Sequence, residues 1–343
     1  MKKLLRDNEI FILAEVAQSY EGKVEVLTET LRKACDAGVD GIMFQVVFVD
    51  ELAVPDYAHY KLFASLEMPD DAWKKAIDLI HEKKRLAVGE VFGKRSLDLV
   101  CALGIDAIKI HISDLANLPF LRLAGKKNIP VLLAIGGAQE DEIRTAIAAL
   151  TESGAPEIVL LHGYQLGPTS VGDTHFHKIA HTIKKFNLPV GYSDHVAGCV
   201  DDKIANKNPL AVPFPLIALG EGARLIEKHI ILDRTKAWED YESALSGDEF
   251  PEFVNLIRSC APALGAESFE SIEPERAYKN RAIKALVAAK DLSKGTKITE
   301  EHLAFKRVSD ITKRIYDTKL VVGRTLTADL KKDGIFSQEV MGN

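Results

Sequence analysis

Short apolar runs alternate with longer amphipathic stretches eight times before residue 230, and this rhythm constrains the fold more than any other feature of the chain. The apolar runs are rich in β-branched residues and almost uninterrupted, which is typical of parallel strands buried on both faces. Strands are predicted at 10–16, 41–47, 85–92, 107–112, 129–135, 157–162, 188–193 and 223–229. Helical patterns lie between them at 25–38, 69–84, 140–154 and 176–186.

Eight strand–helix units predict an α/β protein with a (β/α)8 TIM barrel, and an open doubly wound sheet is the alternative. A closing helix is predicted at 249–265, after the last strand. The following segment, 266–281, is polar enough for a linker. A small β-rich domain is predicted at 282–343, so the barrel domain is expected to span 1–265.

Composition and charge exclude several classes of partner. The formal net charge of −6 provides no basic field for the phosphates of a nucleic acid. No run approaches the roughly 20 apolar residues that span a membrane, and Glu15 interrupts the apolar run near the N-terminus, which also lacks a signal-peptide cleavage site. The widely spaced Cys35, Cys101, Cys199 and Cys260 are expected to be reduced thiols of a cytoplasmic protein.

The carboxyl ends of the predicted strands supply the candidate functional residues, because the active site of a TIM barrel lies at that end. Many residues there are ionisable or polar, a density that the opposite end of a barrel does not need. They are Glu15, Gln45, Glu90, Lys109, His111, His162, Ser193, Asp194, His195, Glu227, Lys228 and His229.

Two of these residues suggest a metal site. His195 and His229 end the predicted seventh and eighth strands, which are neighbours in a barrel. Two imidazoles within reach of each other can hold a divalent transition ion and leave positions open for water and substrate oxygens. In that case Asp194 and Glu227 would orient the rings. The alternative is a pair of hydrogen-bonded structural histidines.

A carboxylate and a lysine extend the candidate site. Glu15 ends an otherwise apolar strand, so it is a candidate for proton transfer or for binding a substrate hydroxyl. The alternative is an ion pair with Lys109 or Lys228. Lys109 is a candidate anion-binding cation or, second, a Schiff-base lysine. Exposed backbone N–H groups at Gly136 and Gly137 would suit a phosphate or carboxylate, although tight turns use glycine anyway.

The order of the motifs resembles that of the sialic acid synthase (N-acetylneuraminate synthase) family. The motifs are "AEV" at 14–16, "FQ" at 44–45, "KIxxxDxxNxP" from Lys109 through Asp114, "LLH" at 160–162, "VGYSDH" at 190–195 and "IEKH" at 226–229. The segment 286–307 resembles the SAF (antifreeze-like) domain that follows the barrel in that family. The resemblance covers nearly the whole chain.

The resemblance implies a domain-swapped homodimer in which each SAF domain covers the partner's barrel mouth. It implies a manganese-type ion (Mg²⁺, Co²⁺ or Zn²⁺ as alternatives) on His195 and His229, which polarises the aldehyde of an open-chain N-acylated sugar. Phosphoenolpyruvate would attack through C3, water would add at C2, and phosphate would leave, giving a nonulosonic acid. Such an enzyme has small-molecule substrates.

The resemblance also implies roles for individual residues. Glu15 would serve in proton transfer or sugar positioning, Asp240 would bind the sugar, and Arg307 would reach the partner's sugar pocket. The predicted substrate-binding residues are Gln45, Glu90, Lys109, Asp114, His162, Gln165, Ser193, Asp240 and Arg307.

The sequence departs from the family where the family contacts phosphoenolpyruvate. Met43 replaces a lysine, Glu90 a threonine, and Ile112 and Ala134 serines. Losing a cation and two hydroxyls while gaining a carboxylate weakens binding of a multiply charged anion. The segment 201–215 resembles an insertion beside the "SDH" motif and is a candidate lid or substrate wall.

Three interpretations follow from this contrast. The first is a phosphoenolpyruvate-dependent synthase acting on an unusual sugar or other aldehyde. The second is a metal-dependent aldolase or lyase in which pyruvate or another less charged ligand replaces phosphoenolpyruvate. The third is a non-catalytic barrel kept for binding, and the intact "SDH" and "EKH" motifs argue against it, because a dead site has no chemical need for metal ligands.

Overall fold

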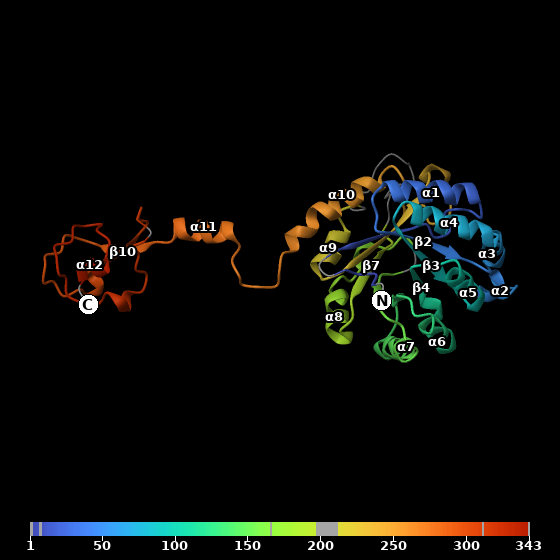
Figure 1. Cartoon of the computed structure of the whole chain (residues 1–343), viewed down its shortest axis with the longest axis horizontal. Coiled ribbons are helices and arrows are strands. Elements are labelled where there is room, and N and C mark those ends of the chain that lie inside the picture. The colour runs from blue at the N-terminus through green and yellow to red at the C-terminus, as the bar shows by residue number, and fades with distance from the viewer. Residues whose placement is uncertain (1–2, 7–8, 165–166, 197–211, 311, 342–343) are drawn as a thin grey trace. The chain divides into compact units, whose positions relative to one another are not determined.

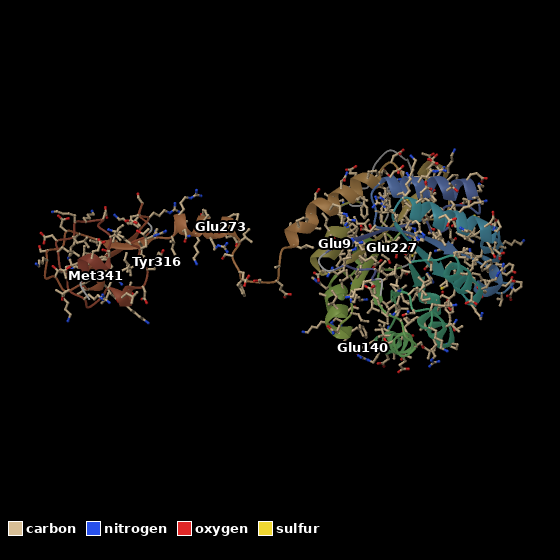
Figure 2. The ribbon with its side chains drawn as sticks, in the orientation of Figure 1. Glu9, Glu140, Glu227, Glu273, Tyr316 and Met341 are labelled. Atoms are coloured by element: carbon tan, nitrogen blue, oxygen red, sulfur yellow. The ribbon has the colours of Figure 1, made fainter. Side chains whose placement is uncertain are left out.

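The chain forms two compact units, Met1–Gly265 and Ala266–Asn343. The computed structural model describes residues 3–6, 9–164, 167–196, 212–310 and 312–341. Figure 1 shows the barrel strands and their helices in the first unit, and α11 (Glu273–Ala282) and β10 (Ala285–Ala288) in the second. Glu227 belongs to the first unit, whereas Tyr316 and Met341 belong to the second (Figure 2).

The first unit is a closed (β/α)8 barrel, as predicted. Its eight parallel strands pair in chain order, and β1 closes the barrel by pairing with β8. The strands are β1 Phe11–Glu15, β2 Gly41–Val46, β3 Leu86–Val91, β4 Ala107–Ile110, β5 Val131–Ala134, β6 Ile158–His162, β7 Val190–Asp194 and β8 Leu225–Ile231. A ninth short strand, β9 (Leu245–Ser246), adds to the end of β8.

Helices surround the barrel (Figure 1). They are α1 Val24–Asp36, α2 Val49–Leu52, α3 Tyr60–Ser65, α4 Asp70–Glu82, α5 Lys94–Ala102, α6 Leu118–Gly125, α7 Glu140–Glu152, α8 His177–Phe186, α9 Pro215–Gly220 and α10 Phe250–Cys260. The predicted closing helix is confirmed as α10, followed by a 3₁₀ turn over Ala261–Leu264. The sequence explains why α7 begins where it does. The Glu142 carboxylate accepts a hydrogen bond from the Gln139 N–H at 2.7 Å, and acidic residues stabilise the positive N-terminal end of a helix.

Strand alternation sorts the side chains into two sets. Outward-facing residues such as Ile12 and Phe44 pack against the helices in the larger core. Inward-facing residues such as Leu13, Met43 and Val88 fill the lower part of the barrel with apolar side chains. On β1–β4 and on β7 and β8, the next inward position along the strand is polar, and this places the candidate site directly on top of the interior apolar layer. On β5 and β6 that position stays apolar, as Ala134 and Leu161.

The second unit has its own small core. Antiparallel strands β10 (Ala285–Ala288) and β11 (Leu303–Lys306) pair there, and the short helix α12 (Gln338–Met341) lies near the C-terminus. The core is formed by Leu286, Ala288, Leu292, Ile298, Val321, Leu326, Leu330, Phe336 and Met341.

The segment predicted as a linker contains a helix that was not predicted from the sequence. Helix α11 (Glu273–Ala282) has no buried residue, so its polar composition follows from its exposure. A proline at its start and an ion pair between Arg276 and Glu273 at 2.9 Å support it locally. Within the described residues, no helix is long and apolar enough to cross a membrane.

Candidate metal centre and barrel mouth

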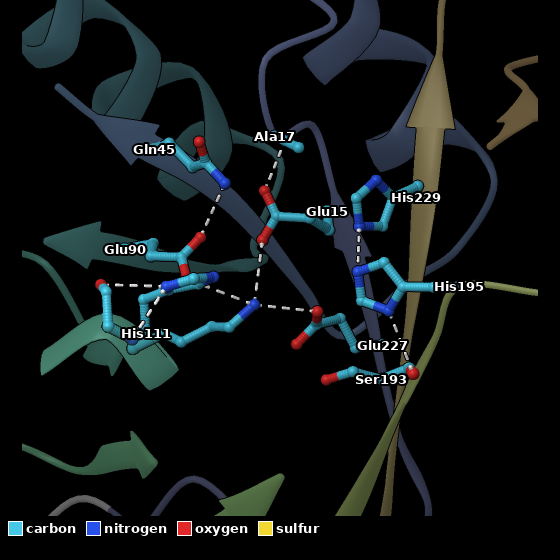
Figure 3. Close-up of polar contacts among 11 residues, drawn as sticks. Glu15, Ala17, Gln45, Glu90, His111, Ser193, His195, Glu227 and His229 are labelled. Carbon is cyan, nitrogen blue, oxygen red and sulfur yellow. Dashed lines mark hydrogen bonds and ion pairs between the residues drawn. The ribbon is translucent and has the colours of Figure 1, made fainter. Parts of the chain in front are cut away.

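His195 and His229 face each other at the barrel mouth. His195 directly follows β7 and His229 lies in β8, and their Nε2 atoms are 3.1 Å apart (Figure 3). Both side chains are buried. The adjacency predicted from the two strand ends is therefore present in the structure.

Burial keeps both imidazoles neutral. It lowers the pKa of His195 to about 3, with a further contribution from the nearby Lys109 charge. It also lowers the pKa of His229 well below its ordinary value, and His195 adds to this shift. Neutral rings leave a nitrogen lone pair free to bind a metal ion.

The hydrogen bonds of the two rings point to a missing partner. His195 Nδ1 lies 3.3 Å from the Ser193 carbonyl oxygen, so a proton on Nδ1 leaves Nε2 bare. His229 Nδ1 is buried and has no hydrogen-bond partner among the residues that the structure describes. If the proton of His229 is on Nε2, its Nδ1 is unprotonated and buried. If the proton is on Nδ1, the two unprotonated Nε2 atoms of His195 and His229 face each other. Each tautomer leaves a buried polar atom unsatisfied.

A divalent ion bound to both Nε2 atoms would remove the repulsion between their lone pairs and leave the proton of His229 on Nδ1. Ligand atoms of His195, Glu227 and His229 all lie within 4.8 Å of one another. Two nitrogens bound to one ion at about 2.0–2.1 Å stand roughly 3.0–3.4 Å apart, depending on the angle at the ion. The observed 3.1 Å lies inside this range. The residues therefore fit a transition-metal ion held by two imidazoles, with Glu227 as the third group within reach.

Asp194 has a different place from the one predicted. Within the described residues, its carboxylate bonds to Lys228 Nζ at 2.8 Å, the Val196 N–H at 3.0 Å and the Tyr192 hydroxyl at 3.2 Å, rather than to a histidine ring. Asp194 and Lys228 are register partners on β7 and β8, and both side chains are fully buried. This ion pair fastens the two strands beside the histidines that they carry.

Three carboxylates surround one lysine inside the barrel mouth. Lys109 Nζ lies 2.9 Å from Glu227 Oε1, 3.5 Å from Glu90 Oε1 and 4.0 Å from Glu15 Oε2. None of the four side chains is more than 3% exposed. The pairing of Glu15 with Lys109, the structural alternative from the sequence, is thus observed. We call Glu15, Glu90, Lys109 and Glu227 the carboxylate–lysine cluster.

The charges in this cluster are strongly interdependent. Burial raises the pKa of Glu15 well above its ordinary value, although Lys109 opposes the shift. Burial also raises the pKa of Glu227. Burial alone would lower the pKa of Lys109, but the three carboxylates outweigh it and hold that pKa above its ordinary value. A lysine held protonated is a poor nucleophile, so the geometry does not support a Schiff-base role.

Unsatisfied polar atoms concentrate at the same place. Among the described residues, eight buried side-chain nitrogen or oxygen atoms lack a well-aligned hydrogen-bond partner, and six of them belong to the mouth. The six are Glu15 Oε2, Gln45 Oε1, Glu90 Oε1, Ser193 Oγ, Glu227 Oε2 and His229 Nδ1. Native proteins seldom leave such atoms unpaired, because each costs about 1–3 kcal/mol. Their clustering marks a ligand site.

Comparison with protein families shows which family the chain belongs to. Residues 30–269 match the model of the NeuB family, and residues 283–339 match the SAF domain. The chain belongs to the NeuB family. The resemblance to sialic acid synthases is thereby confirmed, and so is the prediction of an enzyme that forms carbon–carbon bonds. The non-catalytic interpretation does not agree with these findings.

Individual relatives of this NeuB-family enzyme are synthases of nonulosonic acids. The pseudaminic acid synthase of Campylobacter jejuni is 27% identical over 318 residues, covering 88% of each chain. The N,N'-diacetyllegionaminic acid synthase of Legionella pneumophila is 25% identical over 315 residues, covering 87% of this chain and 85% of that protein. The crystal structure of the N-acetylneuraminic acid synthetase of Leptospira borgpetersenii, in complex with citrate, matches with a TM-score of 0.73 at 25% identity, covering 81% and 94% of the two chains.

Two of the remaining predicted residues lie around the mouth rather than in the cluster. Asp240 Oδ2 accepts a hydrogen bond from the Gln18 N–H at 3.3 Å, and burial raises the pKa of Asp240 to about 6. Asp114 lies in a 3₁₀ turn after β4 and accepts a hydrogen bond from Asn117 Nδ2 at 2.8 Å. Gln165 and most of the segment 201–215 lie outside the described residues.

His162 lies outside the mouth, and Arg307 is described by its contacts within the C-terminal unit. His162 Nε2 lies 2.8 Å from the Thr174 carbonyl oxygen, and the ring stacks near Tyr192 on the outer side of β6. Arg307 belongs to the C-terminal unit, where its Nε donates to the Ala282 carbonyl at 3.1 Å.

A second hollow lies along α7 and α8, and it includes the Gly136–Gly137 turn that the sequence offers as a candidate anion site. It has a volume of about 570 Å³, and Gly136, Gly137 and His162 line it together with Lys178 and Lys185. The two lysines repeat at the spacing of solvent-facing helix positions. No pattern in the sequence distinguishes them from ordinary surface lysines.

Proposed function

We propose that this NeuB-family enzyme makes a nonulosonic, sialic-acid-like sugar acid by a metal-dependent, aldol-type condensation. The acceptor is the aldehyde of an N-acyl sugar or a related aldehyde, and the donor is a three-carbon unit. The observation that carries the proposal is the pair of neutral, buried imidazoles whose Nε2 atoms face each other at 3.1 Å. The synthases named among the relatives support the class of product.

The proposed metal site consists of His195 and His229, with Glu227 in reach. A bound divalent ion, with Mn²⁺ first and Mg²⁺, Co²⁺ or Zn²⁺ as alternatives, would supply Lewis-acid polarisation of the acceptor carbonyl. The two rings are held neutral for this purpose by burial, and the Asp194–Lys228 pair fixes the strands that carry them.

The other mouth residues have proposed roles in binding and proton transfer. Glu15 Oε1 accepts the Ala17 N–H at 2.5 Å, which orients the carboxyl and leaves Oε2 directed at the cluster. We assign Glu15 to proton transfer, because its raised pKa suits a group that both takes and gives a proton. Ser193 Oγ and the Gln45 side chain would orient the donor, and Asp240 would bind a sugar hydroxyl.

The domain arrangement is part of the same proposal. Residues 1–265 would be the catalytic barrel, and 282–343 the SAF-like domain after the linker and α11. As the family resemblance implies, the SAF-like domain of one protomer would cover the barrel mouth of its partner in a homodimer. Arg307 would then complete the partner's sugar pocket.

The test is synthesis of the product with both donors offered together. The full-length protein, loaded with Mn²⁺, is incubated with phosphoenolpyruvate, pyruvate and a panel of aldoses and N-acyl hexosamines, and products are identified by mass spectrometry. We expect at least one acceptor to gain a three-carbon acid unit, and the variant with both His195→Ala and His229→Ala to form none. Absence of any such product from the wild-type protein would refute the proposed function.

A further inference from the structure

Lys109 is the one cation that the barrel strands direct into the mouth. The eight strands contain two lysines and no arginine, and the second lysine, Lys228, is bonded to Asp194 away from the cluster. Lys109 is already enclosed by Glu15, Glu90 and Glu227 within 4.0 Å. Its charge is therefore more than balanced before any substrate arrives.

The cluster as a whole is negative. With all three carboxylates ionised, the carboxylate–lysine cluster has a net charge of −2, and with one carboxyl protonated it has −1. On β2, next to β3, the inward-facing Met43 lies in the apolar layer below and supplies no opposing charge. Apart from a divalent ion on His195 and His229, the described strand residues therefore offer an anionic donor one cation, Lys109, which three carboxylates already surround.

Glu90 is the residue that adds the decisive negative charge to the cluster. It is fully buried, and it lies between Gln45 on β2 and Lys109 on β4 in the strand register. Gln45 Nε2 donates to Glu90 Oε2 at 2.9 Å, which fixes the carboxylate in place. The other oxygen, Oε1, lies 3.5 Å from Lys109 Nζ and has no well-aligned hydrogen-bond partner within the described parts of the chain.

We infer that the donor is a monoanionic 2-oxo acid of the pyruvate type, and that Glu90 is the residue that selects it over a phosphorylated donor. This inference rests on the proposed function. A phosphate group adds about −1.5 to −2 charges at pH 7, and these would lie beside a cluster that is already negative. A 2-oxo acid adds a single carboxylate, which would contact Lys109 and the Ser193 hydroxyl, a group that also interacts with Glu227.

The reaction is balanced without a further reactant. A C3–H bond of the 2-oxo acid breaks, and its proton passes to the free oxygen of Glu15. The electron pair released at C3 forms the new bond to the aldehyde carbon, and Glu15 returns the proton to the aldehyde oxygen, which becomes a hydroxyl. C2 keeps its carbonyl group, so neither water nor phosphate is exchanged.

The hollow along α7 and α8 does not offer a second place for the phosphate of the same donor. It contains Lys178 and Lys185, but it shares no lining residue with the carboxylate–lysine cluster or with His195 and His229. A phosphate bound there would be held by a different set of side chains from those that face the metal centre.

The experiment compares the two donors one at a time. The full-length, Mn²⁺-loaded protein is assayed with the acceptor that forms product, using either pyruvate or phosphoenolpyruvate, and inorganic phosphate release is followed in parallel. We expect kcat/KM for pyruvate to exceed that for phosphoenolpyruvate by at least about a hundredfold, because each additional charge lies close to a buried negative cluster. In Glu90→Gln this ratio should fall at least about tenfold.

Controls separate the donor inference from the function itself. Glu29→Gln, on the exposed side of α1, removes the same charge outside the mouth and should leave the ratio unchanged. Glu90→Thr is the second variant at the same position, and the wild-type ratio decides the matter if neither variant folds. Preference for phosphoenolpyruvate with equal release of phosphate would overturn the donor inference and leave the proposed function intact. No product from either donor would overturn both.

Discussion

The buried Asp194–Lys228 pair gives the sharpest prediction about how the metal site is held. Both side chains are 0% exposed, and Lys228 Nζ lies 2.8 Å from Asp194 Oδ2. Each partner is the chain neighbour of a candidate metal ligand, His195 or His229. Removing one partner leaves a buried charge without its counter-charge, which typically costs about 3–5 kcal/mol of stability.

The structure predicts which of the two single substitutions costs more stability. In Lys228→Met, the Asp194 carboxylate keeps the Tyr192 hydroxyl at 3.2 Å and the Val196 N–H at 3.0 Å. In Asp194→Asn, the Lys228 ammonium keeps the Val196 carbonyl at 3.3 Å and a neutral amide. Lys228→Met should therefore cost about 3 kcal/mol and Asp194→Asn about 5 kcal/mol. The double variant should cost at least about 2 kcal/mol less than the sum.

Urea unfolding followed by tryptophan fluorescence measures these free energies. Both tryptophans, Trp73 and Trp238, belong to the barrel unit, so the signal reports on that unit. Lys75→Met is the matched control, because Lys75 forms an exposed ion pair with Asp71 and its loss should change stability little. The reasoning is wrong if Lys228→Met costs as little as this control, if it costs more than Asp194→Asn, or if the single effects simply add.

Three further predictions concern the mouth. Asp240→Asn should leave the free energy of unfolding unchanged near pH 4 and raise it by up to about 3 kcal/mol at pH 7. Burial raises the pKa of Asp240 from 3.8 to about 6, so the wild-type protein loses stability as the pH rises through that value. Urea unfolding at both pH values checks this, and an equal effect at both would contradict it. Glu15→Gln should lower kcat by about 10²–10⁴-fold while Mn²⁺ content stays constant, as expected for a proton-transfer group, and loss of the ion would instead indicate a structural role. Mixing and refolding Arg307→Ala chains with His229→Ala chains should restore up to a quarter of wild-type activity if Arg307 acts in the partner's site, and no recovery would refute domain swapping.

The barrel was predictable because strand and helix periodicities are local properties of the sequence. Six of the eight strands lie inside their predicted ranges, while β7 and β8 extend one and two residues further. The pairing of His195 with His229 followed from two strands that are neighbours in any eight-stranded barrel. Helix α11 was missed because a polar helix that buries nothing has the composition of a linker.

The cluster around Lys109 was only partly predictable. The contact of Lys109 with Glu227 joins residues 118 positions apart across the barrel, and it depends on how far each side chain reaches inward. No local pattern encodes that reach. The outward position of His162, in contrast, could have been predicted from the alternation of side chains along a strand. Leu161 belongs to the interior layer, so its neighbour His162 must face the helices.

The metal site at His195 and His229 is tested most directly by counting bound ions. The full-length protein is stripped with a chelator and titrated with Mn²⁺, and free Mn²⁺ is measured by electron paramagnetic resonance. We predict one ion per chain for the wild-type protein and none for the variant with both His195→Ala and His229→Ala, with Glu29→Gln as the control that binds normally. A double variant that still binds one ion per chain with unchanged affinity would contradict the assignment.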